Sequence, residues 1–518
     1  MTKNSAHNVT IGSDKASLDD LRAAWRGPGP VQMVLSEADR QAVGASADTI
    51  KELIDSGQRV YGVTTGFGSL ADQNVAPADL EALQEKLVLS HISGLGNDLP
   101  DEVVRLVMVL KVLCLARGYS GARIEIVEAL IKLLAAGIYP AIPEKGSVGA
   151  SGDLAPLASL AGFLIGVGEG RQNGERVTAA EGLDQVGIEA IRLGPKEGLA
   201  LLNGTQVSTA LALTGLFRIE NVFAAAITAG ALSVDAARGS DTPFDPRLHA
   251  ARGHPGQIAV AAALRGLLRG SEIRNSHEDC GKVQDPYCLR CQPQVMGAIL
   301  DTMHHAARVL LIEAGAVSDN PLVFAETGEV LSGGNFHAEP VALVADMLAL
   351  AAAEIGSISE RRTALLMDKN LSGLPAFLVR NPGLNSGFMN AQVAAAALVS
   401  ENKMLAHPAS VDSIPTSANQ EDHVSMATHG ARRLLEMADN AANVIAIELL
   451  CAAQGIEFHH GLKTSEGLQQ VHAIIRDKVP SLEEDRVLTP DIEAVADLIK
   501  AGAFYGFTGA LFTDRDPG

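Results

Sequence analysis

Long stretches of the chain repeat apolar residues at intervals of three and four, the period of an α-helix that buries a face. These stretches are rich in alanine and leucine and contain few helix breakers. We predict long helices at residues 103–116, 206–237, 297–317, 340–371, 390–405 and 424–453. Helices so long and so apolar have to bury more than one face, so we expect a long helical bundle that packs against copies of itself.

The first 110 residues have a different pattern, in which short helical segments alternate with glycine-rich turns at residues 61–68 and 93–96. We therefore predict a mostly α-helical protein made of two parts. Residues 1–110 form a smaller mixed N-terminal region, and residues 111–518 form an elongated helical-bundle domain.

Composition narrows the class of protein. Hydrophobic residues make up 47% of the chain but aromatic residues only 4%, which favours a core of closely packed aliphatic helices. The net charge of −20 argues against binding to nucleic acid and to anionic membrane surfaces, because both favour basic patches. We expect neither partner.

The chain shows no secretion signal, because its first thirty residues are polar and mixed in charge. The apolar run at residues 341–355 is interrupted by Asp346 and Glu354, so we interpret it as a buried helix rather than a membrane span. Five cysteines in 518 residues do not suggest a disulfide framework. We expect a cytoplasmic protein.

The tripeptide Ala150-Ser151-Gly152 is suited to react with itself. Closure of the Gly152 nitrogen on the Ala150 carbonyl carbon gives a five-membered ring. Loss of water from the ring and from Ser151 then leaves an exocyclic methylidene, a strong electrophile. Gly152 has no side chain to block its nitrogen and tolerates unusual backbone angles. Taken alone, such a tripeptide more often marks an ordinary glycine-rich turn, so its context decides.

A helix is expected directly after this tripeptide. Asp153 is suited to be its N-cap, and Pro156 is tolerated in a first turn. The electrophile would then lie at a helix N-terminus, where the helix dipole stabilises developing negative charge.

Four long motifs stand in order along the chain. They are Gly-Ser-Val-Gly-Ala-Ser-Gly-Asp-Leu-Ala-Pro-Leu-Ala at residues 146–158, Leu-Leu-Asn-Gly-Thr-Gln at 201–206, Ser-Gly-Gly-Asn-Phe-His-Ala-Glu-Pro at 332–340 and Asn-Gln-Glu-Asp-His-Val-Ser-Met at 419–426. With them the chain resembles the aromatic amino acid ammonia-lyase family over residues 60–492, and within it the branch that acts on histidine. It differs from the family's usual residues at Thr64 and Cys288.

This resemblance implies the cofactor and the assembly. Ala150, Ser151 and Gly152 would cyclise autocatalytically to 4-methylidene-imidazol-5-one, with no external cofactor. The protein would be a homotetramer in which several subunits build each active site. The implied reaction eliminates ammonia from L-histidine and gives trans-urocanate.

The resemblance also implies the catalytic residues. Tyr61 would be the base that takes the substrate's Cβ proton, which requires its pKa to fall below the usual value near 10. Phe336 would pack beside the electrophile, a position equally compatible with ordinary core packing.

A third set of residues would bind the substrate carboxylate and the carbonyl oxygen of the ring. Arg290 offers a planar fork that matches a carboxylate. Tyr287, Gln284 and Asn203 would assist it, Asn203 and its partners acting as an oxyanion site. Asn203 precedes a glycine, so a simple turn is the alternative interpretation.

Two residues would select histidine. His91 follows Ser90 in a pair that resembles the histidine-specific branch, and Glu421 offers a carboxylate to an imidazole N–H. A buried Glu without a partner is costly, so a polar substrate group there makes physical sense.

Two other motifs give only weak evidence for a function. Cys288 and Cys291 have CxxC spacing but no second ligand pair follows them, so we expect no metal site. The glycines at residues 166–170 follow a predicted helix rather than a strand, which argues against dinucleotide binding.

Two alternatives to the function remain open. One is a lyase or 2,3-aminomutase with the same prosthetic group and another aromatic amino acid as substrate. The other is a catalytically silent helical scaffold whose loop does not cyclise.

Overall fold

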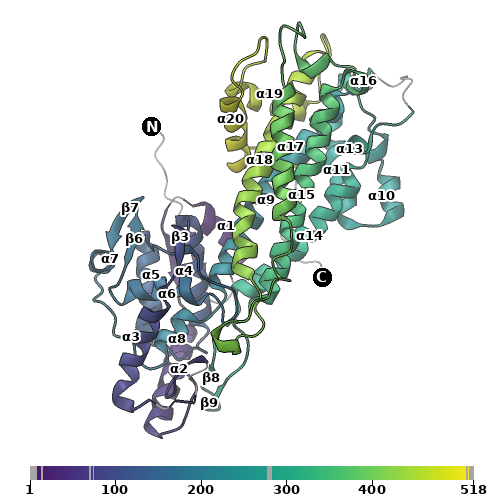
Figure 1. The fold of residues 1–518 in the computed structure, drawn as a ribbon. Helices are drawn as coiled ribbons and strands as arrows, with labels where there is room; N and C mark the ends of the chain where they lie inside the picture. Colours follow the sequence, from purple (N-terminus) through teal and green to yellow (C-terminus); the bar gives the residue numbers. More distant parts are fainter. Residues whose placement is uncertain are drawn as a thin grey trace. The chain divides into compact units, whose positions relative to one another are not determined.

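The computed structural model describes residues 9–12, 16–27, 29–68, 72–73, 75–276, 283–508 and 511–512. Helices dominate the described chain, and the strands are short (Figure 1). The predicted mostly α-helical fold is therefore confirmed.

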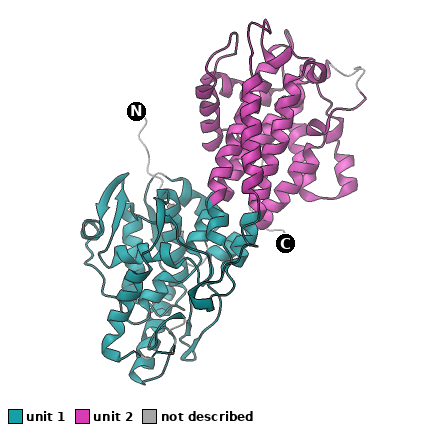
Figure 2. Ribbon diagram, in the orientation of Figure 1, with its two compact units in different colours: residues 1–214, 307–346, 408–432 teal, residues 215–306, 347–407, 433–518 magenta. Residues whose placement is uncertain are grey.

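The chain divides into two compact units, each made of three segments (Figure 2). Unit 1 comprises residues 1–214, 307–346 and 408–432, and unit 2 comprises residues 215–306, 347–407 and 433–518. This is a division by contacts in space, whereas the boundary predicted at residue 110 divides the sequence. That boundary stays a prediction.

The long helices lie within about five residues of the ranges that the apolar period predicts. They are α4 (Asp101–Ala116), α9 (Gln206–Ala236), α14 (Gln292–Ala314), α15 (Glu339–Met367), α17 (Met389–Leu405) and α18 (Ala427–Glu457). The predicted helix at 340–371 is broken near its end. The Asp368 side chain accepts a hydrogen bond from the Asn370 N–H and starts a separate short helix, α16 (Lys369–Ser372).

Unit 1 combines helices with small sheets. Its other helices are α1 (Leu18–Arg26), α2 (Glu37–Asp55), α3 (Leu80–His91), α5 (Ile124–Ala136), α6 (Leu154–Leu164), α7 (Ala179–Gln185) and α8 (Glu197–Leu202). Its strands are β1 (Val9–Gly12), β2 (Val31–Val34), β3 (Leu95–Asp98), β4 (Ile138–Pro140), β5 (Pro143–Lys145), β6 (Glu169–Gln172), β7 (Glu175–Thr178), β8 (Leu322–Phe324) and β9 (Glu329–Leu331). β1 pairs with β2 in parallel, whereas β3–β5, β4–β6–β7 and β8–β9 are antiparallel.

Helix α4 forms the centre of unit 1. Every residue from Val103 to Ala116 is buried, including Arg105 and Lys111. A helix that is apolar around its whole circumference has to be surrounded by other elements. The two buried cations on α4 therefore require partners in the interior.

Unit 2 is almost entirely helical. Besides segments of the long helices it contains α10 (Pro246–Arg252), α11 (Pro255–Leu268), α12 (Glu272–Asn275), α13 (Tyr287–Arg290), α19 (Glu466–Lys478) and α20 (Thr489–Lys500).

A buried ion pair joins three helices of unit 2. Arg362 of α15 donates from Nε to Oε1 of Glu448 at 2.6 Å and from Nη2 to Oε2 at 2.8 Å, and both side chains are fully buried. Ser233 of α9 and Ser359 of α15 also donate to the Glu448 carboxylate, at 2.7 and 2.6 Å. The remaining lone pairs of the carboxylate are thereby used, as a buried charge requires.

Helices α9, α14 and α15 are long and apolar enough to cross a membrane by length and composition alone. In α9, however, 94% of the most apolar window is buried inside the protein, and in α15 67% is. For these two helices, burial within the fold explains the apolar sequence. In α14 the corresponding share is 39%.

The buried ion pair gives a prediction about stability. Glu448→Ala would leave the Arg362 guanidinium buried without its anion and lower the free energy of unfolding by about 3–5 kcal/mol. Thermal or denaturant unfolding measures the loss. Arg247→Ala removes the pair of Arg247 with Asp245, in which the Arg247 side chain is 88% exposed, and serves as the control. Equal stability of the two variants would contradict the prediction.

Candidate active site

The Ala-Ser-Gly loop connects β5 to α6 in unit 1. Gly146, Gly149 and Gly152 have φ angles of 144°, 67° and 71°, a region that favours glycine. The φ of Gly152 confirms the expectation that this residue takes an unusual backbone conformation. Ala150 and Gly152 are buried, and Ser151 is half-buried.

Asp153 ties the loop to its surroundings. Its buried carboxylate accepts from the Ser147 hydroxyl at 2.8 Å, the Thr428 hydroxyl at 2.5 Å, and the Ser208 N–H and hydroxyl at 2.7 and 3.0 Å. The predicted N-cap position of Asp153 is confirmed, but the capping hydrogen bond is not formed. Asp153 does precede α6, but its side chain caps no N–H of that helix, because it is turned toward donors from the loop, α9 and α18. Pro156 does lie in the first turn.

Gly152 approaches the backbone of Gly204 so closely that Gly152 has no space for a side chain. The two residues form an isolated parallel bridge, and the Asp153 N–H donates to the Gly204 carbonyl at 2.8 Å. A Cβ atom on Gly152 would lie 2.2 Å from the Gly204 oxygen. The backbone of residues 203–205 is therefore one wall of the reactive loop.

The Ser151 hydroxyl has a specific partner 270 residues away in the chain. It donates to Oε1 of Glu421 at 2.7 Å. The second carboxylate oxygen, Oε2, accepts from the Thr416 hydroxyl at 2.7 Å. Glu421 is thus oriented from both sides and points at the residue that would lose its hydroxyl.

Asn203 reaches the same loop from the end of α8. Its Nδ2 atom donates to the Ser151 carbonyl at 2.9 Å. Its Oδ1 atom is buried and accepts no hydrogen bond from the described part of the protein. The interpretation of Asn203 as a turn residue alone does not explain this arrangement, because a buried acceptor without a donor is unfavourable.

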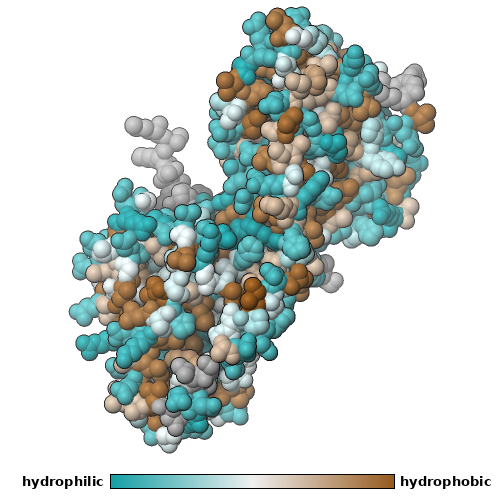
Figure 3. Space-filling view, in the orientation of Figure 1, coloured by the Kyte–Doolittle hydropathy of each residue, from teal (hydrophilic) through white to brown (hydrophobic). Residues whose placement is uncertain are grey.

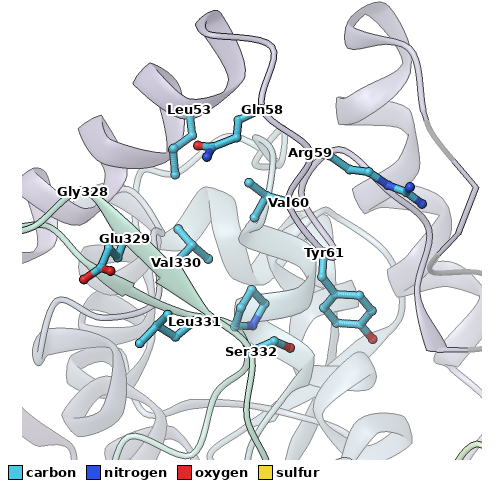
Figure 4. A pocket seen from close by; sticks show the side chains of 11 residues that line it. Leu53, Gln58, Arg59, Val60, Tyr61, Gly328, Glu329, Val330, Leu331 and Ser332 are labelled. Carbon is cyan, nitrogen blue, oxygen red and sulfur yellow. The ribbon is translucent and has the colours of Figure 1, made fainter.

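Tyr61 lies on the loop after α2. Its hydroxyl oxygen accepts from the Gly68 N–H at 3.1 Å. Together with Arg59, Val60 and residues of the β8–β9 hairpin, the tyrosine lines a cavity of about 300 Å³ (Figure 4). Because the Gly68 N–H uses one lone pair of the oxygen, the O–H bond can point toward another group.

His91 is the last residue of α3. Its Nδ1 atom lies 2.8 Å from the Leu87 carbonyl and 3.1 Å from the Ser90 hydroxyl. A carbonyl oxygen only accepts, so Nδ1 carries the proton in this contact and Nε2 is left as an acceptor.

Phe336 is half-buried in the loop before α15. Two residues later, the Ala338 N–H donates to the Gly149 carbonyl at 3.4 Å, so this loop borders the reactive one.

Three of the predicted residues belong to unit 2. The Arg290 guanidinium carbon lies 4.7 Å from the centre of the Tyr287 ring, a cation–π contact. The Tyr287 ring is 70% exposed, and Gln284 just before it is also exposed. The Nε atom of Arg290 is buried and donates to no group in the described part of the chain. This segment therefore presents donors that a carboxylate could use.

Sequence reasoning missed three residues that contact the site. Thr416 orients Glu421, Thr428 bonds Asp153, and Lys111 donates to the backbone of Asn203 at 2.8 Å. Lys111 could have been found, because it is the only charged side chain inside the apolar run at residues 106–116. For the two threonines no signal in the sequence exists.

The two cysteines with CxxC spacing are not joined in a disulfide. Cys288 and Cys291 are free, and burial raises the pKa of Cys288. Among the residues that the structure describes, no group of three or more His, Cys, Asp or Glu side chains is placed to hold a metal ion.

A family model of the aromatic amino acid lyases matches residues 16–477. The chain belongs to the aromatic amino acid lyase family. It is 58% identical over 496 residues to a histidine ammonia-lyase of Desulfotalea psychrophila, with 96% of both chains covered. It is 61% identical over 473 residues to a histidine ammonia-lyase of Aromatoleum aromaticum, with 91% of this chain and 90% of the relative covered.

Solved structures of the same family have the same fold. The crystal structure of histidine ammonia-lyase from Trypanosoma cruzi is 40% identical, with a TM-score of 0.89 over 97% of this chain and 95% of that one. The tyrosine aminomutase from Streptomyces globisporus is 36% identical, with a TM-score of 0.89 over 96% and 97%.

The close approach of Gly152 to Gly204 can be tested by substitution. Gly152→Ala would place a methyl group against the Gly204 carbonyl and force residues 203–205 to move. We expect a clearly lower melting temperature than for Gly168→Ala. Gly168 also has a positive φ, of 92°, but its Cβ would meet open space. The difference between the two variants isolates the clash from the backbone strain of about 1–2 kcal/mol that both share. Identical melting temperatures would refute the tight wall.

Proposed function

We propose that this enzyme is a histidine ammonia-lyase, which converts L-histidine to trans-urocanate and ammonia. The observation that carries the proposal is the contact of Glu421 with Ser151, because it places a fixed carboxylate at the reactive loop. The identity of 58–61% to relatives named histidine ammonia-lyase supports the same substrate. In the reaction the Cβ–H and Cα–N bonds break, the electrons of the C–H bond form the Cα=Cβ double bond, and ammonia leaves.

The residues of the loop suit the internal prosthetic group. Gly152 has no side chain that could shield its nitrogen and takes a left-handed backbone conformation, and both it and Ala150 are buried. The Ser151 carbonyl, which becomes the ring carbonyl, already accepts from Asn203. When formed, 4-methylidene-imidazol-5-one supplies the electrophile to which the substrate amine adds, and no external cofactor is then needed.

Glu421 and His91 would bind the imidazole. A carboxylate accepts the N–H of the substrate imidazole, and the unprotonated Nε2 of His91 can accept a second one when the substrate ring is doubly protonated. Thr416 fixes the Glu421 carboxylate, so that its orientation does not depend on the substrate. A phenyl ring has no N–H, so it could donate neither to the Glu421 carboxylate nor to the His91 imidazole.

Tyr61 would take the Cβ proton. The Gly68 N–H holds the phenol oxygen in place, which fixes the direction in which it can accept or release a proton. Phe336 would close the apolar side of the site and exclude water from it.

Arg290, Tyr287 and Gln284 would hold the substrate carboxylate. The guanidinium is oriented by the Tyr287 ring and has an unused Nε–H. Asn203, whose Oδ1 accepts no hydrogen bond from the described residues, would contact the substrate or the carbonyl of the ring. The family resemblance implies that such residues come from more than one subunit.

We propose a homotetramer because unit 2 leaves apolar side chains exposed along its long helices. On α15 these are Met347 and Leu350, and on α17 they are Met389, Val393 and Met404, with exposures of 38% to 71%. Hydrophobic residues are visible at the surface in Figure 3. An exposed apolar helix face is unfavourable in water and suits a second copy of the chain.

The net charge of −20 suits a cytoplasmic enzyme without nucleic-acid or membrane partners.

A lyase or 2,3-aminomutase for another aromatic amino acid is the second candidate. The likeness to a tyrosine aminomutase at 36% identity favours it, because both reactions use the same fold. Glu421 and His91 speak against it, since an imidazole offers two polar ring nitrogens to this pair, whereas a phenol offers one hydroxyl and a phenyl ring offers no polar group.

The substrate is tested by incubating the purified enzyme with L-histidine, L-phenylalanine and L-tyrosine. We expect urocanate from histidine and no cinnamate or coumarate from the others, followed by absorbance and chromatography. Ser151→Ala should lose nearly all activity and keep its melting temperature, because it lacks the hydroxyl that must leave. Full activity of Ser151→Ala would end the argument for the electrophile, and retention of both waters in the wild-type mass would favour the silent scaffold.

The histidine-binding role of Glu421 gives a further prediction. Glu421→Gln should lower kcat/KM for histidine about 10- to 100-fold, because a hydrogen bond to a charged group is lost. Thr416→Val should lower it about 3- to 10-fold through a less ordered carboxylate. Thr327→Val removes a similar bond of 2.8 Å to Glu329 in the same unit and is the control. An unchanged kcat/KM in Glu421→Gln would exclude this carboxylate as the imidazole partner.

A further inference from the structure

Lys111 is a fully buried lysine in the middle of α4. The residues around it on the helix are apolar, so a charged or polar group here is costly unless it is satisfied. Its Nζ atom donates to two carbonyl oxygens, of Ala200 at 3.1 Å and of Asn203 at 2.8 Å.

The two acceptors lie at the C-terminal end of α8. Carbonyl groups at a helix C-terminus lack partners within the helix and carry the negative end of its dipole. Lys111 supplies donors for them from a neighbouring helix. Lys196, another fully buried lysine, behaves differently, because it pairs with the Asp319 carboxylate at 2.8 Å.

The Asn203 carbonyl accepts from Lys111, and the same residue contacts the Ala-Ser-Gly loop directly. The Asn203 side chain donates to the Ser151 carbonyl at 2.9 Å, and the next carbonyl, of Gly204, accepts from the Asp153 N–H at 2.8 Å. The Lys111 ammonium thus fixes the backbone from which both contacts to the loop originate.

We propose that Lys111 is a positioning residue that holds the Asn203–Gly204 wall against the Ala-Ser-Gly loop, both for ring formation and for catalysis. This inference rests on the proposed function only for its kinetic readout, because ring formation is measured on the protein itself.

The hydrogen bonds do not depend on the charge of Lys111. Burial lowers the pKa of its ammonium. A neutral amine still has two N–H groups, which is the number that the two carbonyls require. The role is therefore geometric, and the removal of the N–H groups is the informative change.

The test compares Lys111→Met with Arg105→Met. Arg105 lies on the same helix, is 6% exposed and donates to the Trp25 carbonyl at 2.7 Å, so its loss removes a buried cation that does not contact the loop. Two properties are measured beside the melting temperature: the fraction of chains that have lost two waters, by intact-protein mass, and kcat and KM for histidine.

We expect both variants to lose stability, and only Lys111→Met to affect the site. It should contain a clear fraction of chains that retain both waters. After correction for that fraction, kcat should fall about tenfold while KM changes less, because a group that orients the reacting loop acts mainly after binding. If Lys111→Met does not fold, Lys111→Gln, which keeps one donor, is compared in its place.

A double variant separates positioning from simple packing. In an Asn203→Ala background, Lys111→Met should have a smaller effect on the dehydrated fraction and kcat than it has alone, because one of the two contacts that Lys111 supports is already absent. Additive effects, or full dehydration with an unchanged kcat in Lys111→Met, would overturn the proposal. If the wild-type protein is dehydrated but does not act on histidine, the proposed substrate fails while the mass comparison still decides the role of Lys111.

Discussion

The buried carboxylate of Asp153 is the interaction on which the reactive loop depends. It gathers donors from the loop itself, from the start of α9 and from the start of α18, segments that are far apart in the chain. A carboxylate with four hydrogen bonds holds its partners more firmly than neutral groups would, because charge-assisted bonds are stronger. The loop that Asp153 fixes can then pack directly against the backbone of Gly204, where Gly152 has no space for a side chain.

Only a few polar contacts hold the reacting residue of the loop, Ser151. Glu421 and Asn203 hold the Ser151 hydroxyl and carbonyl from opposite ends of the residue. Of the groups assigned to the substrate carboxylate, Tyr287 and Arg290 lie on the short helix α13 in unit 2, and Gln284 precedes that helix. Such a distribution suits an enzyme whose reactive group is internal to one element while its substrate contacts come from several.

The sequence allows the long helices to be predicted within a few residues, because their apolar period is strong and local. It also indicates that Gly152 can take unusual backbone angles, as the structure shows. It does not allow the partner of Asp153 to be predicted. A residue of this type before a helix usually caps it, but here donors from α9 and α18 compete for the same oxygens, and no local pattern reveals them. The same holds for Thr416 and for the carbonyls bound by Lys111, since each contact joins segments whose proximity only the fold creates. The family resemblance, in contrast, identifies site residues through motifs, without the geometry.

The hydrogen bond between Ser151 and Glu421 has a consequence for how the enzyme matures. Before the loop reacts, the serine hydroxyl occupies the carboxylate that the proposed function reserves for the imidazole. In the proposed ring formation, dehydration would remove that hydroxyl and leave the carboxylate unoccupied in the same event that creates the electrophile. In a chain whose loop has not cyclised, the Ser151 hydroxyl would therefore compete with the substrate imidazole for Glu421. The contact between Glu421 and the imidazole and the electrophile would therefore become available together.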